Sequence, residues 1–151
     1  MCSAHATVRG FLGEIVQRQD ERDVLVDMEA GLEHLSRGTG RHLSRFVAVL
    51  EPYYRSMETA RRVAALAAEL GIADVVTVAN KVRDDGDRRA IEAFCAAHDM
   101  RLVGAIPYDD TLIESERSGV PPVERVPPGP AVSAIRALLD TLAGERSAAA
   151  G

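Results

Sequence analysis

Four short runs of apolar residues recur along the chain, and they constrain its fold more than any other feature. Each run consists almost entirely of Val, Leu, Ile and Ala and does not alternate with polar residues. Such runs are typical of strands that are buried on both faces of a parallel sheet. We therefore predict strands at Val24–Asp27, Phe46–Leu50, Val75–Ala79 and Leu102–Ile106.

The segments between these strands have the periodicity of amphipathic helices. Ser56 is a candidate N-cap for a helix that ends at Leu70, and Asp87 is one for the next helix. Pro130 can open a last helix, and a first one is expected at about residues 6–17. Strands that alternate with helices predict βαβ units, and therefore a doubly wound, mostly parallel α/β sheet in a three-layer domain.

Length and composition fit a single soluble domain. The chain has 151 residues, of which 46% are hydrophobic and 27% charged. We expect one domain at residues 1–143 and a disordered tail at 144–151. The net charge of −5 gives no electrostatic basis for binding nucleic acid, and no apolar run reaches the roughly 18 residues that a membrane span needs. The two cysteines and the lack of an export signal favour a reduced, cytoplasmic setting.

Asp27 ends the first predicted strand, and Gly31 follows four residues later. Ligands of doubly wound sheets bind at the carboxyl ends of the strands. A carboxylate there can hold a magnesium-bound water, and a glycine amide can meet a terminal phosphate. The alternative is that Asp27 only caps the following turn.

Two further strand ends carry residues that suit a nucleotide base. Asn80 follows the run "VVTVA", and its amide can pair with the N6/N7 edge of adenine, although Asn is also common in plain turns. Lys81 comes next and is the single lysine of the chain. In "AIPYDDT", Pro107 restrains a loop that could line a flat base, or that could simply connect a strand to a helix.

The cysteines give weaker signals. Cys2 and His5 form a C-x-x-H half-site, but zinc normally needs four ligands, so a second chain would have to supply the others. A plain thiol is the alternative. Cys95 falls on the apolar face of its predicted helix, which favours packing in the core over reactivity.

Taken together, these segments resemble one family. The segments are "VLVDMEAGLEHLSRGT", "VLEPYYRSMETARRVAALAAELGI", "VVTVANKV" and "LVGAIPYDDTLIESERSG". They resemble the CooC-type ATPases, which insert nickel during maturation of carbon monoxide dehydrogenase. These belong to the MinD/ParA and nitrogenase-iron-protein-like P-loop ATPases. The resemblance runs from about residue 2 to residue 120 and implies the C-terminal portion of a P-loop NTPase domain.

The resemblance also implies roles for matching residues. Asp27 would be the magnesium-associated carboxylate, and Met28–Gly31 would sense the terminal phosphate. Asp27, Glu29 and Gly31 are thus the candidate catalytic residues. The candidate nucleotide-binding residues are Asn80, Lys81, Pro107, Tyr108 and Asp109.

For cofactors and partners, the resemblance implies ATP or ADP with Mg²⁺, a homodimer, and apo-carbon monoxide dehydrogenase or a related metalloenzyme as the client. Cys2 would match one cysteine of a Cys-x-Cys pair that binds metal, nickel or zinc, between two subunits. The other cysteine of that pair is absent from the sequence.

The sequence contains no G-x-x-x-x-G-K-[ST] phosphate loop, and Lys81 is the sole lysine that could have belonged to one. We therefore expect the 151 residues alone to bind nucleotide weakly and to have no appreciable ATPase activity. Three alternatives remain: a regulatory protein that binds nucleotide without hydrolysis, a truncated or decayed fragment, and a partition or division-site ATPase of the MinD/ParA type. The switch "EAGLEHL" lacks the proline expected of the last group.

Overall fold

The computed structural model describes residues 24–27 and 43–149. The described residues form a parallel sheet of three strands in the order β1-β2-β3. The strands are β1 (Arg45–Leu50), β2 (Asp74–Val82) and β3 (Leu102–Pro107). They confirm three of the four predicted strands, and the run in the central strand β2 is the most deeply buried.

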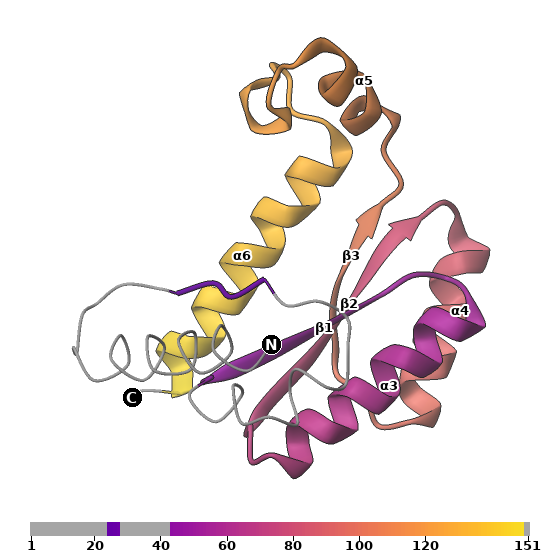
Figure 1. Ribbon diagram of the computed structural model, residues 1–151, viewed down its shortest axis with the longest axis vertical. Coiled ribbons are helices and arrows are strands. Elements are labelled where there is room, and N and C mark those ends of the chain that lie inside the picture. The colour runs from indigo at the N-terminus through magenta and orange to yellow at the C-terminus, as the bar shows by residue number, and fades with distance from the viewer. Residues whose placement is uncertain (1–23, 28–42, 150–151) are drawn as a thin grey trace, which may run out of the picture.

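Helices cover both faces of this sheet (Figure 1). Helices α3 (Tyr54–Glu69) and α4 (Asp85–Ala97) lie on one face, and α6 (Pro130–Ala149) lies on the other, against β3. Helix α5 (Asp110–Ser118) and the short 3-10 helix η2 (Pro122–Glu124) connect β3 to α6. The result is an open α/β sheet in three layers, which is the predicted fold class.

The core lies between the sheet and α3 and α4. In the parallel register Ala48 is opposite Thr77 and Leu50 is opposite Ala79, so these side chains share one face of the sheet. Helix α3 meets that face with alanines, including the buried Ala60. Small side chains allow a helix to approach the sheet closely, and the fully buried Leu50 fills the space between the layers.

Two helices begin in a different place from the prediction. Helix α3 begins at Tyr54, and Ser56 lies inside its first turn, where its Oγ accepts a hydrogen bond from the backbone N–H of Glu51 at 2.9 Å. Helix α4 is capped by Asp84, whose carboxylate accepts from the backbone N–H of Asp87 at 2.9 Å. Ser56 and Asp87 thus lie three residues beyond the observed cap positions, Tyr53 and Asp84, and their side chains still accept backbone hydrogen bonds at the helix start.

The segment at residues 24–27 is not a strand, which corrects the prediction. Its backbone has no regular structure, and Leu25 is 96% exposed. A strand needs a hydrogen-bonded neighbour, and within the described ranges this segment pairs with none of the three strands.

Helix α6 continues through residues that we expected to be a tail. It ends at Ala149, and the carboxylate of Glu145 lies 3.3 Å from the guanidinium of Arg45 and 3.2 Å from that of Arg101. These ion pairs attach the last turns of the helix to the amino end of the sheet. None of the helices in the described part of the chain is both long enough and apolar enough to span a membrane.

Candidate functional site

Because β1, β2 and β3 are parallel, the residues that follow them meet at one edge of the sheet. This carboxyl edge is where open α/β sheets bind ligands. It holds Glu51 after β1, Asn80 and Lys81 near the end of β2, and Tyr108 after β3. The structure therefore gathers the predicted nucleotide-binding residues at one edge.

Strand β2 bulges at this edge. Ala79 pairs with Ala105 and Val82 pairs with Pro107, so two residues of β2, Asn80 and Lys81, lie opposite a single residue of β3. Lys81 has a left-handed backbone with φ of 55°. A non-glycine residue in this conformation costs about 1 kcal/mol, and such strain is concentrated at functional sites.

Contacts from both neighbouring strands brace the bulge. On the β1 side, the Nζ of Lys81 lies 2.7 Å from Oε1 of Glu51. On the β3 side, the backbone N–H of Tyr108 donates to the carbonyl of Val82 at 2.9 Å. The hydrogen bond to Glu51 and its negative charge hold the pKa of Lys81 above the usual value, so Lys81 stays positively charged. The strained conformation is thus supported by side-chain and backbone contacts together.

The side chain of Asn80 is available to a ligand. Asn80 is half-buried, and within the described ranges its amide makes no hydrogen bond. An unpaired amide offers two donors and one acceptor in a plane. This donor set is compatible with the N6/N7 edge of adenine, and the role of Asn80 stays a prediction.

Aromatic side chains surround this edge. The three tyrosines of the chain are Tyr53, Tyr54 and Tyr108, and all are exposed just beyond β1 and β3. The guanidinium of Arg83 donates to the hydroxyl of Tyr53 at 3.3 Å and lies 5.6 Å from the centre of the Tyr108 ring. Cation–π contacts of this kind hold an exposed ring in place, so Tyr108 presents a fixed flat surface beside the bulge.

Asp109 has a structural role that the sequence did not suggest. It is buried, and one of its carboxylate oxygens accepts from the backbone N–H of Thr111 while the other accepts from that of Ala131, both at 2.9 Å. Burial raises the pKa of this carboxyl, but the hydrogen bonds, with the nearby charge of Arg125, together hold it below the usual value. Both carboxylate oxygens of Asp109 are therefore used by backbone N–H groups in the first turns of α5 and α6. Pro107, two residues earlier, ends β3.

Of the predicted catalytic residues, Asp27 alone lies within the described part of the chain. Asp27 is exposed, and its segment, indigo in Figure 1, overlaps α6 in this view. Glu29, Gly31 and Cys2 lie outside the described residues. Among the described residues, no group of three or more His, Cys, Asp and Glu side chains could hold a metal ion. Roles for these residues with Mg²⁺ or nickel stay predictions.

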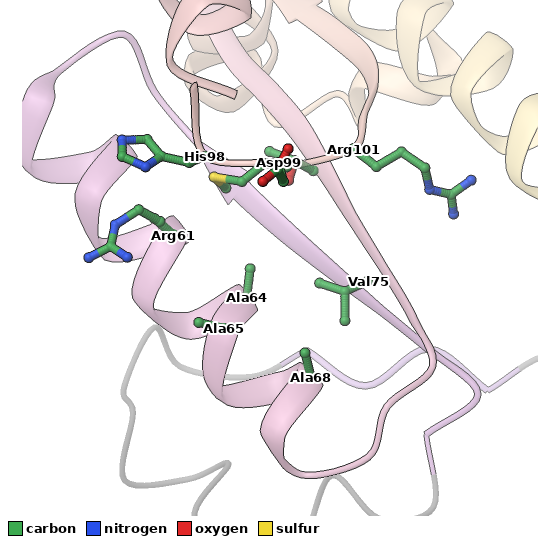
Figure 2. Close-up of a pocket in the computed structure, with 10 residues that line it drawn as sticks. Arg61, Ala64, Ala65, Ala68, Val75, His98, Asp99 and Arg101 are labelled. Atoms are coloured by element: carbon green, nitrogen blue, oxygen red, sulfur yellow. The ribbon is translucent and has the colours of Figure 1, made fainter. Parts of the chain in front are cut away.

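A cavity lies at the opposite end of the sheet (Figure 2). This cavity of about 260 Å³ is formed by α3, the start of β2 and the turn before β3. Alanines of α3, such as Ala64 and Ala68, face Val75 across it, and the side chain of Arg101 extends away from it. It contains none of the predicted site residues.

Sequence reasoning missed Glu51, Tyr53 and Arg83. The signal was present, because "EPYY" follows a predicted strand just as "NKVR" follows the end of another. Residues after successive parallel strands share one edge, so every strand end should be examined, including those without a known motif.

Comparison with known proteins shows the family to which this chain belongs. CooC, a carbon monoxide dehydrogenase accessory protein of Rhodospirillum rubrum, is 38% identical over 120 residues, which make up 80% of this chain and 44% of that protein. An uncharacterized ATP-binding protein of Methanocaldococcus jannaschii is 34% identical over 121 residues, or 80% of this chain and 47% of that protein. The chain belongs to the MinD/ParA-like P-loop ATPase family. It spans about half the length of the curated relatives that it matches.

Solved structures of this family show the same fold. The MinD cell division protein of Aquifex aeolicus superposes with a TM-score of 0.75 at 20% identity, over 93% of this chain and 61% of that chain. The MinC:MinD complex of the same organism gives a TM-score of 0.74, over 93% of this chain and 59% of that chain. No protein-family model matches the chain.

Proposed function

We propose that this chain provides the adenine-binding side of the ATP site of a CooC-like maturation ATPase. The observation that supports this is the unpaired amide of Asn80 on a braced bulge at the carboxyl edge. CooC of Rhodospirillum rubrum, by its name, assists carbon monoxide dehydrogenase. The proposed role of the whole protein is therefore ATP-driven insertion of nickel into that enzyme or a similar one.

The chemistry proposed for the whole protein is phosphoryl transfer to water in a cytoplasmic homodimer. Such catalysis relies on positioning and on electrostatic stabilisation of the phosphates by a loop lysine and Mg²⁺. The described residues supply neither, since Lys81 is paired with Glu51 on the base side. What they can do is orient the nucleotide, because an amide that pairs with adenine fixes the register of the whole ligand.

Nucleotide binding by the purified chain tests this proposal. We expect ADP to bind more tightly than GDP, because guanine presents the acceptor O6 where adenine presents the donor N6. Replacing Asn80 with Ala should weaken ADP binding about tenfold, in line with the loss of a bidentate base contact. Isothermal titration calorimetry measures both effects.

Thr141→Ala is the matched control. Thr141 is exposed on α6, and its hydroxyl donates only to the carbonyl of Ala137 within the same helix. This variant should bind ADP as the native chain does. Equal affinity for ADP and GDP, or an Asn80→Ala variant that binds like the native chain, would contradict the proposal.

The client can be tested separately. The whole protein should activate apo-carbon monoxide dehydrogenase in the presence of nickel and ATP, and Asn80→Ala should slow that activation at limiting ATP but not at saturating ATP. Activation that needs no ATP would exclude the proposed client role and leave the adenine assignment to the binding experiment.

A further inference from the structure

The inference concerns Glu51, and it rests on the proposed adenine site. We propose that Glu51 is a positioning residue, whose ion pair with Lys81 holds the β2 bulge in its left-handed form and so fixes Asn80 toward a purine nucleotide. Glu51 itself would not touch the ligand.

Glu51 is held rigidly at the end of β1. Its backbone N–H donates to Oγ of Ser56 in the first turn of α3, and its carbonyl accepts from the N–H of Tyr53 at 2.7 Å. Its side chain is about one quarter exposed. A residue anchored in this way can restrain its partner, because Glu51 loses little further conformational entropy when the ion pair forms.

Lys81 is the residue in the bulge that needs restraint. Its left-handed backbone, with φ of 55°, is unfavourable for a side chain that carries a Cβ atom. Glycine is the residue that adopts this conformation without steric cost. The Tyr108–Val82 hydrogen bond ties the bulge to the β3 side. The 2.7 Å contact with Glu51 ties the strained Lys81 to the β1 side.

Asn80 depends on Lys81 because the two residues share one bulge. The register with β3 is interrupted after Ala79 and regained at Val82, so Asn80 has no partner residue directly opposite it in β3. If the backbone of Lys81 leaves the left-handed region, the side-chain amide of Asn80 changes its direction as well. The apparent affinity for nucleotide then falls in proportion to the fraction of molecules whose bulge keeps the binding-competent form.

Three variants separate positioning from direct contact. Glu51→Gln and Lys81→Ala each remove the ion pair and keep a Cβ in the left-handed position, so both should weaken ADP binding about fivefold. Lys81→Gly also removes the ammonium group but makes the left-handed backbone favourable. It should bind ADP at least about threefold more tightly than Lys81→Ala. If Lys81 contacted the nucleotide directly, the Gly and Ala variants would be equally weak.

A second readout does not depend on nucleotide. Asn80 is the only asparagine of the chain, so selective ¹⁵N-asparagine labelling gives a single backbone amide signal. We expect this signal to shift or broaden in Glu51→Gln and Lys81→Ala and to recover a single sharp form in Lys81→Gly. Glu114→Gln is the control. Glu114 lies on α5 and pairs with Arg125, so this variant removes an ion pair away from the bulge and should leave the Asn80 signal unchanged.

The two proposals fail in different ways. A native chain that binds no ADP overturns the adenine site, and the Asn80 signal then still decides whether Glu51 controls the bulge. An Asn80 signal and an ADP affinity that are unchanged in Glu51→Gln overturn the positioning role. So does a Lys81→Gly variant that binds as weakly as Lys81→Ala.

Discussion

At the scale of single residues, Asp109 joins two helices with one carboxylate. Its oxygens accept backbone hydrogen bonds from Thr111 in α5 and Ala131 in α6. Gly129 makes this approach possible, because a Cβ atom there would lie 2.6 Å from an oxygen of Asp109 and 2.4 Å from Oγ1 of Thr111. The loop from β3 to α6 is thereby fixed at a point next to the proposed base-binding surface of Tyr108.

Replacing Asp109 with Ala should lower the free energy of unfolding by about 2 kcal/mol, since it leaves two helix N-termini without their cap. The neighbouring Asp110 is exposed in the first turn of α5 and is the matched control. Asp110→Ala should cost only about 0.5 kcal/mol through the helix dipole. Urea denaturation measures both, and equal losses for the two variants would contradict the capping role.

The same carboxylate predicts a dependence of stability on pH. The pKa of Asp109 lies below its usual value in the folded chain, so the unfolded chain binds a proton more readily. The contribution of Asp109 is present above the pKa of an unfolded aspartate, about 4, and is lost as the pH falls through the lower folded value. Between pH 6 and 3 the native chain should therefore lose more stability than Asp109→Asn.

At the scale of elements, glycines act in opposite ways in the two C-terminal helices. Gly119 ends α5 with a left-handed φ of 67°, and its N–H donates to the carbonyl of Glu116. Gly144 lies inside α6, and a Cβ added there would meet no atom within 4 Å. The first glycine supplies a conformation that the helix end requires, whereas the second only adds freedom to the unfolded chain.

Alanine at these two positions should change stability in opposite directions. Gly119→Ala should lower the free energy of unfolding by about 1 kcal/mol, because alanine is strained at positive φ. Gly144→Ala should raise it by about 0.5–1 kcal/mol, because alanine favours the helix. Thermal unfolding followed by circular dichroism measures both, and changes of the same sign would show that the helix ends are assigned incorrectly.

At the scale of the whole molecule, ion pairs connect all three strands to α6 at the amino end of the sheet. Asp74 at the start of β2 bonds Arg45 of β1 and Arg101 just before β3. The same two arginines pair with Glu145, and Arg45 also donates to the carbonyl of Leu142 at 2.8 Å. This network closes the end of the sheet opposite the proposed nucleotide site.

Replacing Asp74 with Ala should lower the free energy of unfolding by about 1 kcal/mol in dilute buffer, since the partly buried Arg45 and the exposed Arg101 lose a shared partner. The loss should shrink in about 1 M NaCl, where charges are screened within about 3 Å. Glu92→Ala is the control, because Glu92 is exposed and its nearest cation, Arg88, is 3.9 Å away. If the loss at Asp74 does not change with salt, the network acts through packing and not through charge.

The sequence by itself determined the layers of this fold and the presence of Asn80 at a strand end. Continuous apolar runs are typical of strands in a parallel sheet, so three strands could be predicted from them alone. The run at residues 24–27 has the same composition, yet it pairs with no strand of the described sheet. Composition predicts the tendency to form a strand, but hydrogen bonding needs a neighbour.

Only the tertiary structure decided what Glu51, Lys81 and Asp109 do. The ion pair joins residues 51 and 81, and the double cap joins residues 109 and 131. Contacts between residues so far apart in the chain leave no periodic pattern in the sequence, because nothing about either partner alone indicates the other. The packing of parallel strands, which brings their ends to one edge, is what turns such residues into a site.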